Sequence, residues 1–583
     1  MWNKWFQGQC EQRLFPYTGG VEWRIQWVAP SMVVVMFLVL ALCSAGKPPG
    51  SDEFWFLQGA KDLALTGIPW RTEDGGSFIL HPPLYPYLVA LSYHVFGFYG
   101  MSAKLVGILC ACGMLWVAGR FLAMERRGVW PLGLLLIALN PLFIQGSVLL
   151  DSDNTVLSLL LILFILGWIR LDQGGEDHGR PWKWGFLFGA SLWAKLTTPL
   201  LLGALLVGFM VIRRKLALLL HVLIPAFIVG LIFFAGTFWV YCQLKNLAWT
   251  QPFEYLVSAF RAHSSWNQSR SNIVEVGKNQ MELLLWFQPS LVILFGWAVI
   301  MRLRAISQCR DFLANDLLWI FATAVTLGYL VVGGTNFGFP RYSFPALIPI
   351  CLVVWSFAAS SLASCSGRWG RIFILCVGLT VFQMSVVSDP LHTFRYVIRD
   401  ALIQGTSLTV PIGQLAGQVI AGVVVPLIAW RLYFKRETGL NTLRVALFFT
   451  ALTQCAGLDV KHAVAAYNTN YNYGETGSAE VVATIARSIA PGQRVVATLE
   501  ITGGLTWEGL STRKVSNSVW NDADILERQI RDPNTEYVVY SITSNTVAQH
   551  RNILAGSRVQ AALQGGFEAT RIGGYTVWRR VRK

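Results

Sequence analysis

The chain has 583 residues, of which 54% are hydrophobic and 14% charged, and its formal net charge is +15. With a mean hydropathy of +0.48, this composition excludes an ordinary soluble globular protein, in which about a quarter of the residues are charged. It also excludes an intrinsically disordered chain, which requires low hydrophobicity. Ten cysteines are too few for a disulfide-stabilised secreted module. The composition therefore predicts a membrane protein.

About thirteen apolar stretches approach the length of roughly 17–25 residues that crosses the hydrocarbon core of a bilayer. The first follows 27 residues rich in Trp, longer than a usual signal-peptide leader, which favours an uncleaved anchor over a cleaved signal. The sequence therefore predicts an all-α polytopic membrane protein with about 13 transmembrane helices and with its termini on opposite sides. The stretches are residues 28–45, 101–123, 127–149, 154–170, 182–195, 196–212, 216–241, 282–301, 314–332, 344–364, 371–388, 408–430 and 441–458.

Lys and Arg cluster in the loops between these stretches, a pattern that sets membrane orientation and is not typical of nucleic-acid binding. Twenty-one of them fall in one set of alternate loops and eleven in the other. Because cytoplasmic loops retain positive charge, this bias places the N-terminus in the cytoplasm. Residues 46–100, residues 242–281 and everything after about residue 460 are then expected outside. The aromatic segment at residues 84–100 is predicted to be an interfacial helix; if it were a span, all later loops would invert.

From about residue 470 the composition becomes that of a soluble domain. Helical patterns at residues 478–490 and 522–530 alternate with strand-like runs at 494–501, 536–543 and 574–581. Residues 470–583 are therefore predicted to form a small extracytoplasmic α/β domain, which is large enough for a core of its own. Its glycines follow neither GxGxxG nor P-loop spacing, so no nucleotide site is predicted there.

Two acidic segments lie at the predicted outer ends of spans, where charged groups are informative because the membrane interior disfavours them. Asp52 and Glu53 follow the first span, in a helix-like stretch that Ser51 begins, and Asp151 and Asp153 lie between the third and fourth spans. Each segment alone is also consistent with helix capping, since Asp, Ser and Asn favour helix starts. Because both are predicted on the same side of the membrane, they are candidates for one catalytic site.

The order of these features resembles that of the GT-C membrane glycosyltransferases. The features are Asp52-Glu53 after the first span, the motif His81-Pro82-Pro83-Leu84-Tyr85-Pro86, an aromatic helix and a second acidic cluster. They look closest to glycosyltransferase family 39, which includes the protein O-mannosyltransferases and the lipid A aminoarabinose transferases. The likeness is strongest over residues 25–215 and continues weakly through Phe339-Pro340-Arg341-Tyr342-Ser343-Phe344-Pro345. It implies a transmembrane catalytic domain at residues 1–465, with extracytoplasmic loops at 46–100 and 242–281.

The resemblance also implies an inverting enzyme of the cell inner (cytoplasmic) membrane. Such an enzyme transfers a sugar, on the outer face, from a polyprenyl-phosphate-linked donor to a protein, lipid or glycan acceptor. The family's first-loop acid is the candidate catalytic carboxylate and carries over to Asp52, with Glu53 beside it. The second acid carries over to Asp153, with Asp151 as the alternative. The aminoarabinose transferases carry Glu-Lys before Pro-Pro-Leu, whereas this chain has Leu80-His81, so it lacks the carboxylate and the lysine through which the family would bind a metal or a phosphate at that point.

Sugar transfer from a lipid phosphate needs a base for an acceptor hydroxyl and positive charge near the departing phosphate. Arg341, Lys195 and His81 are the outer-face cations predicted to contact the donor phosphate. The alternatives are interface anchoring for Arg341 and snorkelling for Lys195. His81 and His263 are candidates for a divalent metal, although histidines that bind only water are commoner in loops. The cofactor is left open, and the loop at 242–281 is either a lid over the site or an interfacial helix.

A polytopic transporter or flippase of lipid-linked saccharides is the alternative function. Transporters place substrate ligands near the bilayer midplane, often in matching broken helices of two repeats. In this chain the notable acids lie at the outer boundary and no internal repeat is evident, which favours the glycosyltransferase. A sensor with a ligand-binding outer tail would leave both acidic segments without a role.

Overall fold

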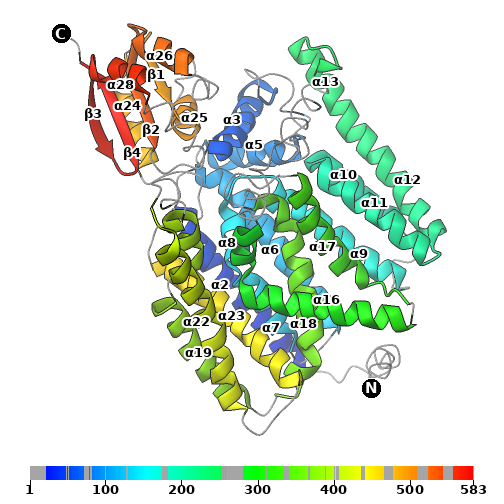
Figure 1. Cartoon of the computed structure of the whole chain (residues 1–583). Helices are drawn as coiled ribbons and strands as arrows, with labels where there is room; N and C mark the ends of the chain where they lie inside the picture. Colours follow the sequence, from blue (N-terminus) through cyan, green and yellow to red (C-terminus); the bar gives the residue numbers. More distant parts are fainter. Residues whose placement is uncertain are drawn as a thin grey trace.

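Long helices gathered in a bundle make up most of the molecule, and a small sheet with its own helices lies at one end (Figure 1). The structure is a computed structural model. It describes residues 21–46, 49, 51–70, 78, 82–98, 100–125, 129–173, 181–251, 254, 257, 280–309, 311–332, 340–365, 368–387, 389–398, 401, 406–434, 440–464, 477–490, 492–507, 523–541 and 556–581.

Each of the predicted apolar stretches coincides with one or more helices of the bundle. Their bounds are α2 Val21–Ala45, α3 Ser51–Thr66, α5 Leu84–Phe96, α6 Gly100–Glu125, α7 Trp130–Ala138, α8 Pro141–Val148, η1 Asp153–Leu157, α9 Ser158–Asp172, α10 Trp182–Ala194, α11 Thr197–Ile212, α12 Leu216–Gly230, η3 Leu231–Ala235, α13 Gly236–Lys245, α16 Pro289–Cys309, α17 Asp316–Val332, η5 Arg341–Ala346, α18 Leu347–Ala363, α19 Trp369–Ser385, α20 Pro390–His392, η7 Thr393–Ile398, α22 Thr409–Tyr433 and α23 Leu440–Val464.

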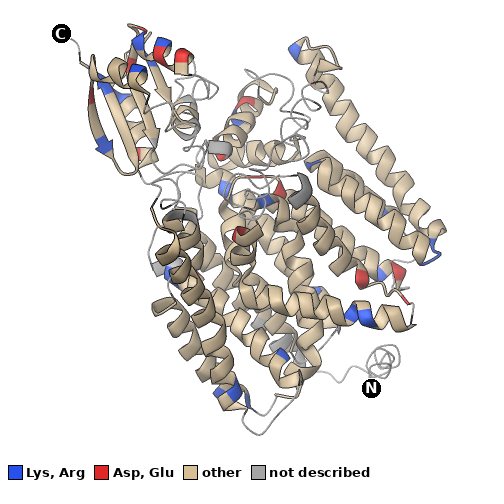
Figure 2. Ribbon diagram, in the orientation of Figure 1, with Lys and Arg blue, Asp and Glu red and all other residues tan. Residues whose placement is uncertain are grey.

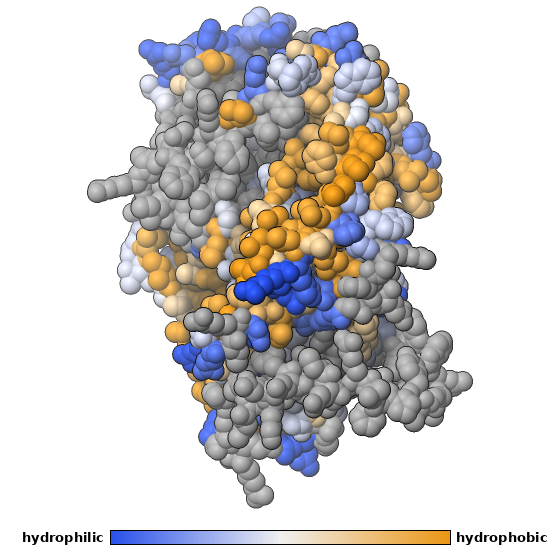
Figure 3. Space-filling view, turned by 90° about the vertical axis from the view of Figure 1, so that its right-hand side faces the viewer, coloured by the Kyte–Doolittle hydropathy of each residue, from blue (hydrophilic) through white to orange (hydrophobic). Residues whose placement is uncertain are grey.

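Eight of the described helices are long and apolar enough to cross a membrane, and a ninth span is formed if the bent pair α7 and α8 counts as one. Three shorter apolar helices also lie within the described part: residues 30–45, 197–212 and 316–328. The chain is therefore a multi-pass membrane protein, whereas the number of about thirteen spans stays a prediction. Acidic and basic side chains gather near helix ends and in the C-terminal part (Figure 2). On the side that carries α12, the described surface shows a continuous apolar band (Figure 3), and several large apolar side chains of α12 are exposed.

The stretch predicted as a span at residues 127–149 consists of two helices, because the chain bends by 55° between α7 and α8. Asn140 has extended backbone angles, and its Oδ1 accepts a hydrogen bond from the Leu142 N–H at 3.0 Å. Pro141 has no N–H to continue α7, but it suits the first position of a new helix. The bend thus ends one helix and starts a second, and α8 leads directly into the acidic segment at residues 151–153.

The C-terminal α/β unit, residues 477–581, is a four-stranded sheet with helices on both faces. Strand order is β1-β2-β4-β3, with β1 parallel to β2 and the other two pairs antiparallel. Alternate residues of the strands enter two separate cores. One core contains Val495, Val539 and Ile501, and the other contains Val496 and Val538. The elements are α24 Ser478–Ser488, β1 Arg494–Ala497, α25 Leu499–Trp507, α26 Ala523–Arg531, β2 Thr535–Ser541, α28 Ser557–Gln564, β3 Phe567–Ile572 and β4 Tyr575–Arg580.

The strand predicted at residues 494–501 is correct only to Ala497, since α25 begins at Leu499. The Thr498 N–H still donates to the Val539 carbonyl of the sheet, at 3.3 Å, and the Thr498 carbonyl already accepts from Ile501 and Thr502. Thr498 therefore belongs to both elements and joins them without a loop. Helix α28 and strand β3 were not predicted, because their short patterns have no strong apolar periodicity.

Candidate functional site

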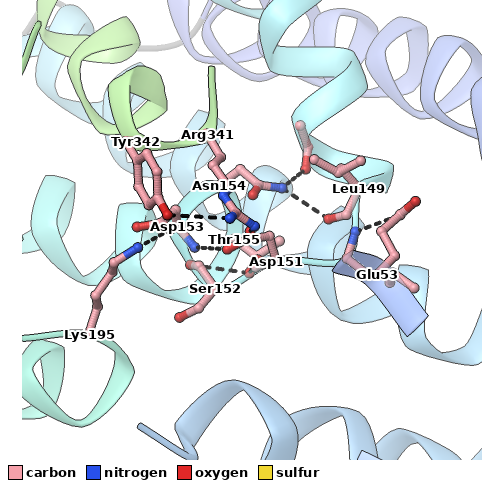
Figure 4. Close-up of polar contacts among 12 residues, drawn as sticks. Glu53, Leu149, Asp151, Ser152, Asp153, Asn154, Thr155, Lys195, Arg341 and Tyr342 are labelled. Atoms are coloured by element: carbon pink, nitrogen blue, oxygen red, sulfur yellow. Dashed lines mark hydrogen bonds and ion pairs between the residues drawn. The ribbon is translucent and has the colours of Figure 1, made fainter. Parts of the chain in front are cut away.

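The two predicted acidic segments lie side by side although they are about a hundred residues apart in sequence. Glu53, in the first turn of α3, is 2% exposed. Its Oε1 accepts a hydrogen bond from the Leu150 N–H at 3.0 Å. Since Leu150 directly precedes Asp151, this bond joins the start of α3 to the second acidic segment (Figure 4).

Each aspartate of the second segment pairs with a cation from a distant part of the chain. Arg341 Nη1 lies 2.7 Å from Asp151 Oδ2, and Lys195 Nζ forms an ion pair with Asp153 Oδ2. All four side chains are buried. Burying a charge costs free energy unless the charge is paired and hydrogen-bonded. Within each pair, the attraction between the two charges offsets the cost of removing them from water.

The backbone of the acidic segment is fixed by its own side chains. The Asp153 N–H donates to Asp151 Oδ1 at 3.0 Å, which makes an Asx turn. Asn154 Nδ2 donates to the carbonyls of Gly146 and Leu149, and Thr155 Oγ1 donates to the Asp151 carbonyl. These bonds tie the end of α8 to η1. They hold both carboxylates in place without a regular helix cap.

Lys195 and Arg341 come from breaks between helices, which lets both reach the acidic segment. Lys195 is the extended residue between α10 and α11, and Arg341 opens η5. The ring of Tyr342 contacts both cations, with its centroid 4.2 Å from Lys195 Nζ and 5.0 Å from Arg341 Cζ. A cation over an aromatic ring is attracted by the ring quadrupole. Tyr342 therefore helps to hold both cations, a role that the sequence did not indicate.

Two further buried polar residues near the acids were not predicted. Tyr85 of α5 is fully buried, and its Oη has no hydrogen-bond partner among the described residues. Burial raises the pKa of Tyr85 well above its ordinary value, and the charges of Asp151 and Glu53 raise that pKa further. Lys104 of α6 is 3% exposed and donates to the Ala45 carbonyl at 2.7 Å. A lysine inside an apolar run is rarely accidental, and that signal was present in the sequence.

Counting only the side chains that the structure describes, which leaves out Asp52, the site is close to neutral and keeps one carboxylate oxygen available. Three acids (Glu53, Asp151, Asp153) are matched by three cations (Lys104, Lys195, Arg341), all buried. Asp153 Oδ1 has no hydrogen-bond partner among the described residues, whereas Oδ2 pairs with Lys195. A buried acceptor without a donor is costly unless a ligand or water supplies one. Asp153 Oδ1 is therefore suited to accept a hydrogen bond from a bound hydroxyl.

Comparison with known proteins finds a family model that matches part of the chain and solved structures that share its fold. The family model for dolichyl-phosphate-mannose-protein mannosyltransferase matches residues 80–239, a range that includes Asp151, Asp153 and Lys195. The chain is similar to the crystal structure of ArnT from Cupriavidus metallidurans bound to undecaprenyl phosphate, with 14% identity, a TM-score of 0.58 and coverage of 97% of this chain and 99% of that chain. The apo state of that protein gives 15% identity, a TM-score of 0.55 and coverage of 96% and 98%. No curated protein sequence matches the chain.

The chain has the GT-C glycosyltransferase fold. The resemblance to glycosyltransferase family 39 is thereby confirmed, as is the fold class of an all-α membrane bundle with a small C-terminal α/β part. Within this GT-C fold, the start of α3, the segment after α8, the α10–α11 break and η5 all converge on one buried polar site (Figure 4).

Three of the predicted site residues fall outside what the structure describes. The backbone of Asp52 lies in the first turn of α3 of the GT-C bundle, but its side chain is outside the described part. His81, His263 and most of the loop at 242–281 are also outside it. Among the described residues, no group of three His, Cys, Asp or Glu side chains could hold a metal ion. The roles of Asp52, His81 and His263 and the lid therefore stay predictions.

Proposed function

We propose that the chain is an inverting glycosyltransferase that moves a sugar from a polyprenyl-phosphate-linked donor to an acceptor. The observation that carries this proposal is the buried cluster of Glu53, Asp151 and Asp153 with Lys195 and Arg341, set in a GT-C fold. The family whose model matches is named for the transfer of mannose from dolichyl phosphate mannose to protein. The solved relative binds undecaprenyl phosphate. Both names support a lipid-phosphate donor.

The reaction is a single displacement at the anomeric carbon. The acceptor oxygen attacks this carbon from the side opposite the phosphate, and the bond between the carbon and the phosphate oxygen breaks. The polyprenyl phosphate leaves with the bonding electrons, so the configuration inverts. Asp52 is proposed as the base that takes the acceptor proton, with Glu53 and Asp153 (or Asp151) orienting the reactants. Arg341 and Lys195 are proposed to stabilise the charge on the departing phosphate.

We place the site at the outer face of the inner membrane, with the N-terminus in the cytoplasm. The helix formed by η1 and α9 runs from Asp153 to Asp172. At 1.5 Å per residue its 20 residues span about 30 Å, the thickness of the hydrocarbon core. Asp172 pairs with Arg213 and Lys215 at the opposite end, in a loop that the positive-inside rule assigns to the cytoplasm. This orientation puts the acidic cluster and the predicted domain at residues 470–583 outside.

The transporter or flippase finds no comparable support. Its substrate ligands would be expected near the middle of the spans, but Asp153 lies at the first residue of its helix. The acceptor is proposed to be a lipid, a protein or a glycan. A divalent metal stays a hypothesis based on His81 and His263.

The decisive experiment incubates the purified protein with a panel of polyprenyl-phosphate sugars and with lipid, peptide and glycan acceptors. We expect mass spectrometry to find one acceptor enlarged by one sugar and an equal amount of free polyprenyl phosphate. Movement of intact donor between leaflets of a vesicle, without release of polyprenyl phosphate, would instead support the flippase.

The Tyr85 hydroxyl provides a sharper test of the site. Tyr85→Phe keeps the ring, which contacts Phe56 edge-on at 5.5 Å between centroids, but removes the hydroxyl that faces the carboxylates. We expect transfer to fall roughly tenfold, as for the loss of one polar contact of about 1.4 kcal/mol at the reacting groups, without a change in thermal stability.

The matched control is Tyr93→Phe, on the same helix. Its hydroxyl is also without a hydrogen-bond partner among the described residues, but its ring contacts Phe98 and Trp507 and not the acidic cluster. We expect the control to retain the wild-type rate. Equal rates for both variants would remove Tyr85 from the site.

A further inference from the structure

Helix α25 of the C-terminal α/β unit lies against α3, the helix that begins with the predicted catalytic acids (Figure 1). It is firmly attached to its own sheet, because Thr498 joins it to β1 and because Ile501 and Leu505 are buried in the core under the strands. A displacement of α25 would therefore have to move the sheet as well.

The closest approach is between the backbone of α25 and Phe54, the residue after Glu53. A Cβ added at Gly503 would lie 2.6 Å from Phe54 Cβ and 3.0 Å from its Cγ. At Gly504 an added Cβ would lie 3.4 Å from Phe54 Cζ. The missing side chain at Gly503 thus lets Phe54 pack directly on the helix backbone, whereas the close neighbour of Gly504 is Val482 of the same unit, 2.6 Å from an added Cβ.

A second contact, two turns along α3, fixes the other end of α25. Lys61 Nζ donates to the Trp507 carbonyl at 2.7 Å and lies 4.6 Å from the centroid of the Trp507 ring. Trp507 is the last residue of α25, where the helix dipole favours a cation. The Trp507 ring also lies 5.9 Å from that of Tyr93 in α5. The contact therefore involves both α3 and α5, the two helices between α2 and α6.

We infer that the C-terminal α/β unit positions the acidic end of α3 for catalysis, with Gly503 and Trp507 as positioning residues that act through Phe54 and Lys61. Phe54 is covalently next to Glu53, whose carboxylate holds Leu150 beside Asp151. A shift of Phe54 therefore moves the first acidic segment relative to the second. This inference rests on the proposed function, since it assigns α25 a role in that reaction.

The first test is Gly503→Ala, which forces Phe54 or α25 to move. Misplacing reacting groups by about 1 Å is enough to cost up to 10²-fold in rate, so we expect kcat to fall by about ten- to a hundredfold. The KM for the lipid donor should stay within about twofold, because the donor-binding cations are on other elements. The matched control is Gly566→Ala, in the same unit, where an added Cβ meets nothing within 4 Å; it should retain wild-type kcat.

A second pair of variants keeps the inference falsifiable if Gly503→Ala does not fold. Lys61→Met retains the aliphatic stem but removes the bond to Trp507, and Lys61→Arg restores a donor to the same carbonyl. We expect Lys61→Met to lower kcat and to speed amide hydrogen exchange in residues 51–66, while exchange in β1 and β2 is unchanged. Lys61→Arg should recover most of both properties.

The outcomes separate this inference from the proposed function. If the wild-type protein transfers no sugar from any donor, the proposed function fails and with it the inference. If the wild type is active and Lys61→Met matches it in kcat and in exchange of α3, the inference alone is overturned. A rise in KM with unchanged kcat would also overturn it, since that result assigns the unit to substrate binding.

Discussion

Asp52→Asn is expected to lose sugar transfer by about 10²- to 10⁴-fold, the contribution typical of a positioned general base. The amide has nearly the same shape as the carboxylate but does not take the acceptor proton. Since Asp52 lies in the first turn of a helix, where Asn is also tolerated, protein yield and donor binding should remain close to those of the wild type. Initial rates of transfer in membranes, with donor binding measured separately, test this prediction.

The control for this substitution is Asp62→Asn on the same helix. Asp62 accepts a hydrogen bond from Gln58 at 2.6 Å, one turn away, and lies more than two turns of α3 beyond Asp52. The control should transfer sugar at nearly the wild-type rate. If Asp52→Asn retained full activity, the base would have to be another residue, such as Glu53 or Asp153, and the proposed mechanism would be contradicted.

Lys195→Met should destabilise the protein strongly as well as inactivate it. Asp153 is fully buried, and without Lys195 its charge loses its ion-pair partner. Removal of one partner of a buried pair costs about 3–5 kcal/mol. The control is Arg494→Met, which breaks the Arg494–Asp532 pair, whose side chains are 57% and 21% exposed. This control should cost only about 0–1 kcal/mol of stability. Thermal unfolding in detergent measures both.

The double variant Lys195→Met with Asp153→Asn separates the two effects. It removes both charges, so much of the lost stability should return, while transfer stays absent because the cation near the phosphate and the carboxylate are both missing. Recovery of transfer in the double variant would show that neither charge takes part in the reaction. Failure to recover stability would show that the pair is not the main cause of the loss.

The helices of the bundle were largely predictable because apolar length alone marks a membrane span. The breaks within them were not. Asn140-Pro141 ends a helix inside an apolar run, and Gln288, which has a positive φ of 74°, separates α16 from the helical residues before it. Hydrophobicity does not report such bends, since side chains on both sides of them are equally apolar. The same limit applies to residues 499–501, where a helix follows a strand without any loop.

The sequence identified most of the charged residues of the site, but it did not show which acid pairs with which cation. The acids and cations near the outer boundary were identified because charge is rare in such a chain. That Asp151 pairs with Arg341 and Asp153 with Lys195 depends on how three separated segments pack, and no local pattern encodes it. Lys104 was overlooked because the cations were sought in the loops between predicted spans, and Tyr342 because tyrosine at a span end is usually an interface residue.

The bend between α7 and α8 and the late position of Arg341 in the chain have a consequence for biogenesis. The aspartates are inserted into the membrane nearly two hundred residues before the arginine that pairs with Asp151 has been synthesised. During that interval the translated portion must keep a carboxylate hydrated or protonated at the lipid boundary. The Asp151–Arg341 pair therefore forms only after η5 has been synthesised, so a nascent chain that stops short of η5 has an incomplete site.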